Sequence, residues 1–172
     1  VVQGLANGTP YQVQLRARNE LGLGNASSST TLTPSRAPFA PSIQSIVRGD
    51  TTLTVAYQLG ANGGNAISDV EYSVDGGINW LQQPAPSIVS PLRIASLTNG
   101  TNYTVKVRAV NVQGSGDASV SSTGTPVGVP SAPTVTSATR GNQSATVAFT
   151  LGAANGGTTS NIEYSLDNGT SW

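Results

Sequence analysis

The chain repeats itself at a fixed spacing, and this constrains its fold more than any other feature. Residues 5–11 (LANGTPY) return as residues 97–103 (LTNGTNY), an offset of about 92 residues. The register then holds without a gap until Trp80 matches Trp172. By direct comparison, about 37 of 80 superposed positions are identical. Because this period is one small domain long, the sequence predicts a tandem array.

The phase of the repeat sets the expected domain boundaries. We expect a complete domain over residues 35–126, the C-terminal part of a preceding domain over 1–34, and the N-terminal part of a following domain over 127–172. Half a domain would expose unpaired strand edges. Two explanations remain open: the residues are a window of a longer array, or the start of one chain completes the end of its neighbour by head-to-tail strand exchange.

Composition excludes several classes of function. The 8 basic and 8 acidic residues balance, and only 9% of residues are charged, so nucleic acid and anionic membranes are not expected partners. Apolar runs fall short of the roughly 20 residues that a membrane span needs. Cys, His and Met are absent, which removes thiolate and imidazole chemistry and the usual metal ligands. We therefore expect no catalytic residue, no cofactor and no metal site.

Three segments alternate apolar and polar residues, as half-buried strands do. They are residues 51–57, 69–75 and 103–109. The side chains expected on the inner faces of the first two are Leu53, Val55, Tyr57, Val70, Tyr72 and Val74. The third copy keeps the second pattern with Ile162, Tyr164 and Leu166.

Turn residues separate these strands. Residues 75–77 (DGG) and 167–169 (DNG) are typical of tight hairpins, and residues 60–65 of an open loop. No stretch carries the period of an amphipathic helix. Short strands at this spacing predict an all-β fold, an antiparallel β-sandwich.

The run LTNGTNYTVKVRAVNVQGSG resembles the second half of a fibronectin type III domain, which is an immunoglobulin-like sandwich. The residues that carry the resemblance are Leu97, Thr101 and Tyr103, with Leu5, Thr9 and Tyr11 in the earlier copy. It implies a tyrosine corner, in which the hydroxyl bonds back to the main chain. Tyr57 and Phe149 stand where that family usually has tryptophan, which suggests a bacterial-type subfamily.

Arg48, Gly49 and Asp50 spell the tripeptide that integrin-binding domains display. In the resembled family, however, that loop joins the last two strands, whereas this one is expected to join the first two. The next copy has Asn142 in place of Asp50. We therefore expect a simple turn, in which glycine takes a positive φ and Asp or Asn bonds its own backbone.

Asp69 and Glu71 are expected on one outward, solvated strand face, roughly 7 Å apart. Asn161 replaces Asp69 in the next copy, which weakens a calcium or glycosidase interpretation. The resemblance favours an ion pair across the sheet between Glu71 and either Arg108 or Lys106.

Trp80 is expected to pack at the edge of the sandwich, although it could contact sugar or another repeat. Sequons begin at Asn25, Asn99, Asn102 and Asn142. In so Asn-rich a chain, a role in turns is favoured over glycosylation.

These features together predict a non-enzymatic structural or adhesive repeat of a large extracellular or cell-surface protein, acting as a spacer or fibre-forming element. The expected partners are neighbouring repeats or other copies of the chain, with surface polysaccharide as a further class. Two alternatives are accessory spacers of a secreted polysaccharide-degrading enzyme and a phage or virion surface protein.

Overall fold

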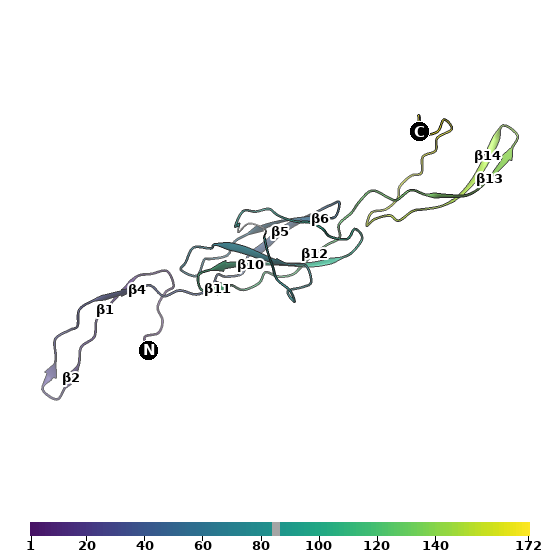
Figure 1. Cartoon of the computed structure of the whole chain (residues 1–172). Coiled ribbons are helices and arrows are strands. Elements are labelled where there is room, and N and C mark those ends of the chain that lie inside the picture. The colour runs from purple at the N-terminus through teal and green to yellow at the C-terminus, as the bar shows by residue number, and fades with distance from the viewer. Residues whose placement is uncertain (84–86) are drawn as a thin grey trace. The chain divides into compact units, whose positions relative to one another are not determined.

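A computed structural model describes residues 1–83 and 87–172 (Figure 1). These residues form strands and no helix. The strands are β1 (Tyr11–Val13), β2 (Arg18–Asn19), β3 (Gly22–Leu23), β4 (Thr30–Leu32), β5 (Ser42–Gly49), β6 (Thr52–Gln58), β7 (Asp69–Ser73), β8 (Leu81–Gln82), β9 (Leu92–Ile94), β10 (Tyr103–Asn111), β11 (Gly114–Ser115), β12 (Ser122–Gly124), β13 (Thr134–Gly141) and β14 (Ser144–Thr150).

The strands form five sheets. The largest has the order β11-β10-β7-β8, with β12 also paired to β10, and a second has the order β5-β6-β9. The pairs β1–β4, β2–β3 and β13–β14 stand as separate antiparallel ribbons. By contacts the described residues divide into two compact units. The first contains 1–44, 57–90 and 104–122, and the second contains 45–56, 91–103 and 123–172.

Each larger sheet contains a strand, β6 or β10, whose inner face is buried as the alternating pattern predicts. On β6, Leu53 and Val55 are fully buried and Tyr57 is nearly so. On β10, Val105 and Val107 are fully buried. Antiparallel pairing joins β6 to β9 and β7 to β10. The predicted class, an all-β immunoglobulin-like sandwich, is confirmed.

The tyrosine corner is also present. The Tyr103 hydroxyl oxygen accepts the Thr98 N–H at 3.0 Å, and the Tyr11 hydroxyl oxygen accepts the Ala6 N–H at 2.9 Å. Leu97 lies buried beside this turn in the sequence. The same bond therefore forms in both copies, as the resemblance implied.

The hairpin that follows the corner recurs as well. Asn19 pairs with Gly22 between β2 and β3, and Asn111 pairs with Gly114 between β10 and β11. In each, the asparagine side-chain oxygen accepts the amide N–H two residues further on, at 3.0 and 2.8 Å. The asparagine and glycine that the two hairpins share at one phase therefore give the same local geometry.

One strand prediction needs correction. Tyr72 and Val74 are only half-buried, whereas Ser73 on the other face of β7 is fully buried. Side chains therefore cover both faces of this strand, which an alternating pattern does not predict. In the next copy, residues 161–165 form no strand, and Tyr164 is 75% exposed. Without a neighbouring strand, these residues have no ladder to join.

Candidate functional site

Backbone hydrogen bonds hold the junction between successive repeats in the first unit. The N–H of Gly8 donates to the Pro34 carbonyl at 2.8 Å. The N–H of Arg36 donates to the Gly63 carbonyl, also at 2.8 Å. Residues 34–36 are therefore hydrogen-bonded to Gly8 of the preceding repeat and to Gly63 of the central repeat.

The same bonds recur at the equivalent positions of the second unit. The N–H of Gly100 donates to the Pro126 carbonyl at 3.0 Å, and the N–H of Gly128 donates to the Asn155 carbonyl at 2.9 Å. Because both partners of each bond are backbone groups, the pattern survives the replacement of Arg36 by Gly128.

Glycine is required where the two repeats touch. Gly64 has φ of 97° and Gly156 has φ of 85°, a region that side chains disfavour. A Cβ on Gly156 would lie 2.5 Å from the Pro126 oxygen and 2.8 Å from the Gly100 nitrogen. On Gly64 it would lie 2.6 Å from the Gly8 nitrogen. Gly64 lies in the predicted open loop of residues 60–65, and the recurrence of glycine at the same phase, residue 156, is the sequence signal for this contact.

At the first junction the buried Asn111 side-chain amide donates to the Arg36 and Asn62 carbonyls at 2.9 and 2.8 Å, whereas the charged side chains add little. Arg36 pairs with Asp117 at 2.9 Å and stacks on Phe39, 4.2 Å from the ring centroid. Both charged side chains are well exposed, so the pair contributes only a few tenths of a kcal/mol. The backbone contacts, which both junctions share, define the candidate functional site.

The predicted turn between the first two strands is present, but Arg48 and Gly49 still belong to β5 and the turn residues are Asp50 and Thr51. The prediction that its glycine has positive φ is wrong, because Thr51 takes that conformation, with φ of 51°. A Cβ at residue 49 would lie 2.5 Å from the Thr52 hydroxyl oxygen, so a side chain there requires that hydroxyl to rotate away.

The carboxylate of Asp50 accepts a hydrogen bond from the Asn99 side-chain amide at 2.7 Å, rather than bonding its own backbone. The Asn99 side-chain oxygen accepts the Thr51 N–H at 2.9 Å. Asn99 therefore fixes the turn through both ends of its amide. Glycosylation of Asn99 would disrupt this pairing.

The predicted solvated face of Asp69 and Glu71 is wrong, because both residues are less than 10% exposed. Glu71 accepts hydrogen bonds from Arg108 at 2.6 Å and from the Ser115 hydroxyl at 3.0 Å. Of the two partners left open, Arg108 is therefore the one used. Asp69 instead accepts the N–H of Ser87 at 3.0 Å. The two carboxylates thus have separate structural partners.

Trp80 lies beneath the same arginine. The Arg108 guanidinium carbon is 4.2 Å from the Trp80 ring centroid, a cation–π distance. The carboxylate of Glu71 fixes the guanidinium on the indole face. This cluster, Glu71, Arg108 and Trp80, covers the outer face of β7 and explains its burial.

We expect Glu71→Gln to lower the free energy of unfolding by about 1–2 kcal/mol, since a charge-assisted bond to a partly buried arginine is lost. Urea denaturation followed by tryptophan fluorescence measures this. Glu20→Gln removes the same charge at an exposed turn and should cost less than about 0.5 kcal/mol. Equal effects of the two variants would contradict a structural role for the cluster.

A second recurring feature is the hairpin that follows β7. The Asp75 carboxylate accepts hydrogen bonds from the Ser73 hydroxyl at 2.6 Å and from the amides of Ile78 and Asn79 at 3.0 Å. The Gly77 N–H donates to the Ser73 hydroxyl at 2.8 Å. These bonds, with the Ser73 hydroxyl as the largest cause, hold the pKa of Asp75 well below its usual range.

The equivalent hairpin in the third copy is built the same way. The Asp167 carboxylate accepts hydrogen bonds from the hydroxyls of Ser171 and Ser165 and from the Ser171 amide at 2.9 Å. These bonds, led by the Ser171 hydroxyl, lower the pKa of Asp167 to about 2. The turn around Asp167 therefore forms even though residues 161–165 form no strand.

The Asp167 carboxylate predicts how the stability of the third copy depends on pH. Because the folded pKa of Asp167, about 2, lies below the unfolded value of about 3.9, its stabilisation is fully present above the unfolded pKa. It is lost as pH falls through the folded pKa. Carbon-detected NMR of the Asp167 carboxyl should give a midpoint near 2, against about 3.9 in urea-unfolded protein. A midpoint in folded protein that matched the unfolded one would contradict these bonds.

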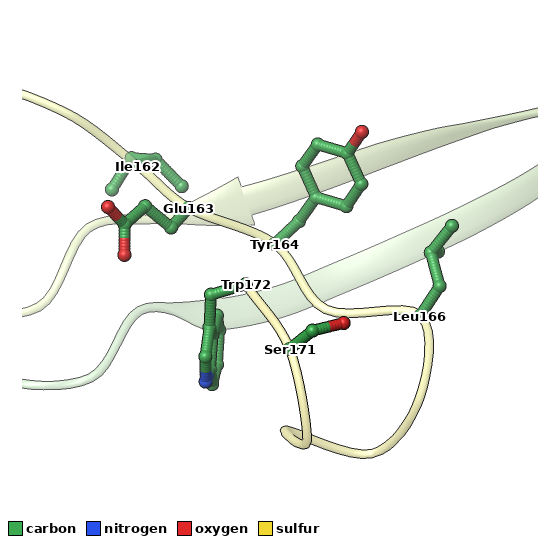
Figure 2. Close-up of a pocket in the computed structure, with 6 residues that line it drawn as sticks. All are labelled: Ile162, Glu163, Tyr164, Leu166, Ser171 and Trp172. Atoms are coloured by element: carbon green, nitrogen blue, oxygen red, sulfur yellow. The ribbon is translucent and has the colours of Figure 1, made fainter.

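A shallow hollow of about 430 Å³ lies in the third copy (Figure 2). Its lining residues are Ile162, Glu163, Tyr164, Leu166, Ser171 and Trp172. Several of these are apolar and well exposed, including Trp172 at 76%. The hollow is thus an uncovered apolar surface.

Metal-binding clusters and membrane spans are both missing from the part of the chain that the structure describes. Within residues 1–83 and 87–172, no group of three or more carboxylate side chains is placed to hold a metal ion. The same residues contain no helix with the length and hydropathy of a membrane span.

No family model matches the chain. It is similar to the crystal structure of chicken CNTN1 FN1–FN3 domains, with 21% identity and a TM-score of 0.40, over 76% of this chain and 49% of that one. The chain thus spans about half the length of that structure. It is also similar to a structure described as a myokine structure, with 18% identity and a TM-score of 0.40, over 54% of this chain and 98% of that one. Both likenesses concern the fold alone.

Proposed function

We propose that this chain is a non-enzymatic spacer of a large extracellular or cell-surface protein of bacterial type. In this proposal, fibronectin type III-like repeats of about 92 residues follow one another, with residues 35–126 as one complete unit. Their role is to extend and connect, so their partners are neighbouring repeats or other copies of the chain. Surface polysaccharide is a further class of adhesive target.

The observation that carries the proposal is the recurrence of the junction contacts. The bonds of Gly8 and Arg36 in one junction return as those of Gly100 and Gly128 in the next. A spacer transmits length and direction only when each repeat is held to the one before it. Bonds between backbone groups contribute to this hold at both junctions, although Arg36 is replaced by Gly128.

Composition supports the same proposal. Serine, threonine, glycine and asparagine are abundant, and cysteine and histidine are absent. Such a chain lacks the thiolate nucleophile and the imidazole general base that many enzymes use. Its stability rests on apolar burial instead of disulfides, which a unit of about 90 residues can support.

Nitrogen-15 relaxation of the 172-residue chain tests the spacer role. If the junctions are rigid, amides of β1, β10 and β13 will report one common rotational correlation time. Inserting Gly-Ser-Gly-Ser between Val129 and Pro130 is the control, and it should uncouple the β13 amides. A wild-type chain whose β13 amides already tumble independently would overturn the proposal.

A further inference from the structure

Glycine directly follows five asparagines of the chain, namely Asn7, Asn62, Asn99, Asn155 and Asn168. Such a pair can deamidate without an enzyme. The glycine backbone nitrogen attacks the side-chain carbonyl carbon of the asparagine, and ammonia leaves as a five-membered succinimide ring closes. Glycine favours this step because it has no Cβ to shield its nitrogen. The contacts of each pair in the folded chain then decide which asparagine reacts.

At three of the five pairs, the glycine N–H already donates a hydrogen bond. The donors and acceptors are Gly8 to the Pro34 carbonyl, Gly100 to the Pro126 carbonyl and Gly169 to the Ser165 hydroxyl, at 2.8, 3.0 and 2.7 Å. A nitrogen held in this way must give up its bond before it can attack. Asn7, Asn99 and Asn168 are therefore protected in the folded chain.

At the fourth pair, the asparagine side chain is held instead. The side-chain amide of Asn155 donates to the Val129 carbonyl at 2.7 Å. The amide must turn towards the nitrogen of Gly156 for the ring to close, so it must first leave this carbonyl. Asn155 is therefore also protected.

The fifth pair, Asn62 and Gly63, has neither restraint. Within residues 1–83 and 87–172, the N–H of Gly63 has no hydrogen-bond acceptor, although this glycine is buried. Asn62 is exposed, and its side-chain oxygen accepts the N–H of Gly64 at 2.9 Å. A donor at this oxygen stabilises the negative charge that develops there during attack on the carbonyl carbon. The pair thus combines an unbonded nucleophile with an activated carbonyl.

We propose that Asn62 is the deamidation site of the folded chain. The Gly63 nitrogen forms a bond to the side-chain carbonyl carbon of Asn62. The bond between that carbon and the amide nitrogen breaks, and the nitrogen leaves as ammonia with the proton of the Gly63 N–H. Water then opens the succinimide at either carbonyl and leaves an aspartyl or an isoaspartyl residue. Water is consumed and ammonia is released, with no change of oxidation state.

The isoaspartyl product alters the first junction. In the unmodified chain, the main-chain carbonyl of Asn62 accepts the Asn111 side-chain amide at 2.8 Å, and the Gly63 carbonyl accepts the Arg36 N–H at 2.8 Å. The isoaspartyl linkage turns the first carbonyl into a carboxylate and lengthens the main chain to Gly63 by a methylene group. Deamidation therefore loosens the hold on Arg36. The reaction itself does not rest on the spacer role, because it depends on the contacts of one loop.

Ageing the 172-residue chain in mildly alkaline buffer tests the site. Peptide mapping by mass spectrometry, with electron-transfer fragmentation, locates each aspartyl or isoaspartyl product. Asn62 should react at least about tenfold faster than Asn99. In urea, where the folded contacts are absent, the two rates should differ by less than about threefold. The proposal is overturned if another pair reacts as fast as Asn62 in the folded chain, or if only the unfolded chain reacts.

Asn62→Gln is the matched variant. Glutamine keeps the amide, but it must close a six-membered ring, which is slower, so residue 62 should stay unmodified. Deamidated wild-type chain carries an added negative charge, and anion exchange isolates it for hydrogen-exchange measurement. The Arg36 amide should lose at least about tenfold of its protection in this fraction and keep its protection when the Asn62→Gln chain is aged. Equal protection of Arg36 in modified and unmodified wild-type chain would contradict the loosening of the junction.

Discussion

Val55→Ala will lower the free energy of unfolding of the central repeat by about 2–3 kcal/mol. Val55 is fully buried on the inner face of β6, directly opposite Leu92 of β9. The substitution removes two buried methyl groups and leaves a cavity. The lost apolar burial and the cavity both destabilise the fold. Native-state hydrogen exchange of the β6 and β10 amides in dilute protein measures the loss.

The repeat supplies a matched control for this prediction. Val147 occupies the equivalent position on β14 and is 49% exposed. Val147→Ala removes the same two methyl groups. It should change the free energy of unfolding that the central amides report by less than about 0.5 kcal/mol. If Val147→Ala destabilised the central amides as much as Val55→Ala, burial in the central repeat would not be the cause.

Features that depend on neighbours in sequence were predictable. The tyrosine corner of Tyr103 spans five residues to Thr98, and the alternation of β6 needs only a buried face. The turn at 167–169 is likewise held by hydrogen bonds to Asp167 from nearby Ser165 and Ser171. Such local patterns fix local geometry whatever surrounds them.

Features that depend on distant partners were not predictable in full. The pattern around Glu71 indicated a solvated face, but Arg108 and Trp80 come from other segments to cover it. Residues 161–165 have almost the sequence of β7, yet they form no strand without an adjacent one. A strand is a property of a pair of segments, so a single-segment pattern overpredicts it.

Gly156→Ala will open the second junction. At φ of 85°, an alanine costs about 1–2 kcal/mol in backbone strain, and its Cβ would also meet the Pro126 oxygen at 2.5 Å. Because backbone atoms cannot move aside as a flexible side chain can, we expect a total cost of about 3 kcal/mol. The amides of Gly100 and Gly128, which donate to Pro126 and Asn155, should lose at least about a hundredfold of their protection from hydrogen exchange.

Gly157→Ala tests whether this effect belongs to the contact or to glycine in general. Gly157 lies one residue further on, outside the positive-φ region, and a Cβ there would meet nothing closer than 3.6 Å. Its substitution should leave the exchange of Gly100 and Gly128 within about twofold of wild type. If both variants exposed these amides equally, the loop as a whole would hold the junction, and the close approach of Gly100 to Gly156 would not be what fixes one repeat to the next.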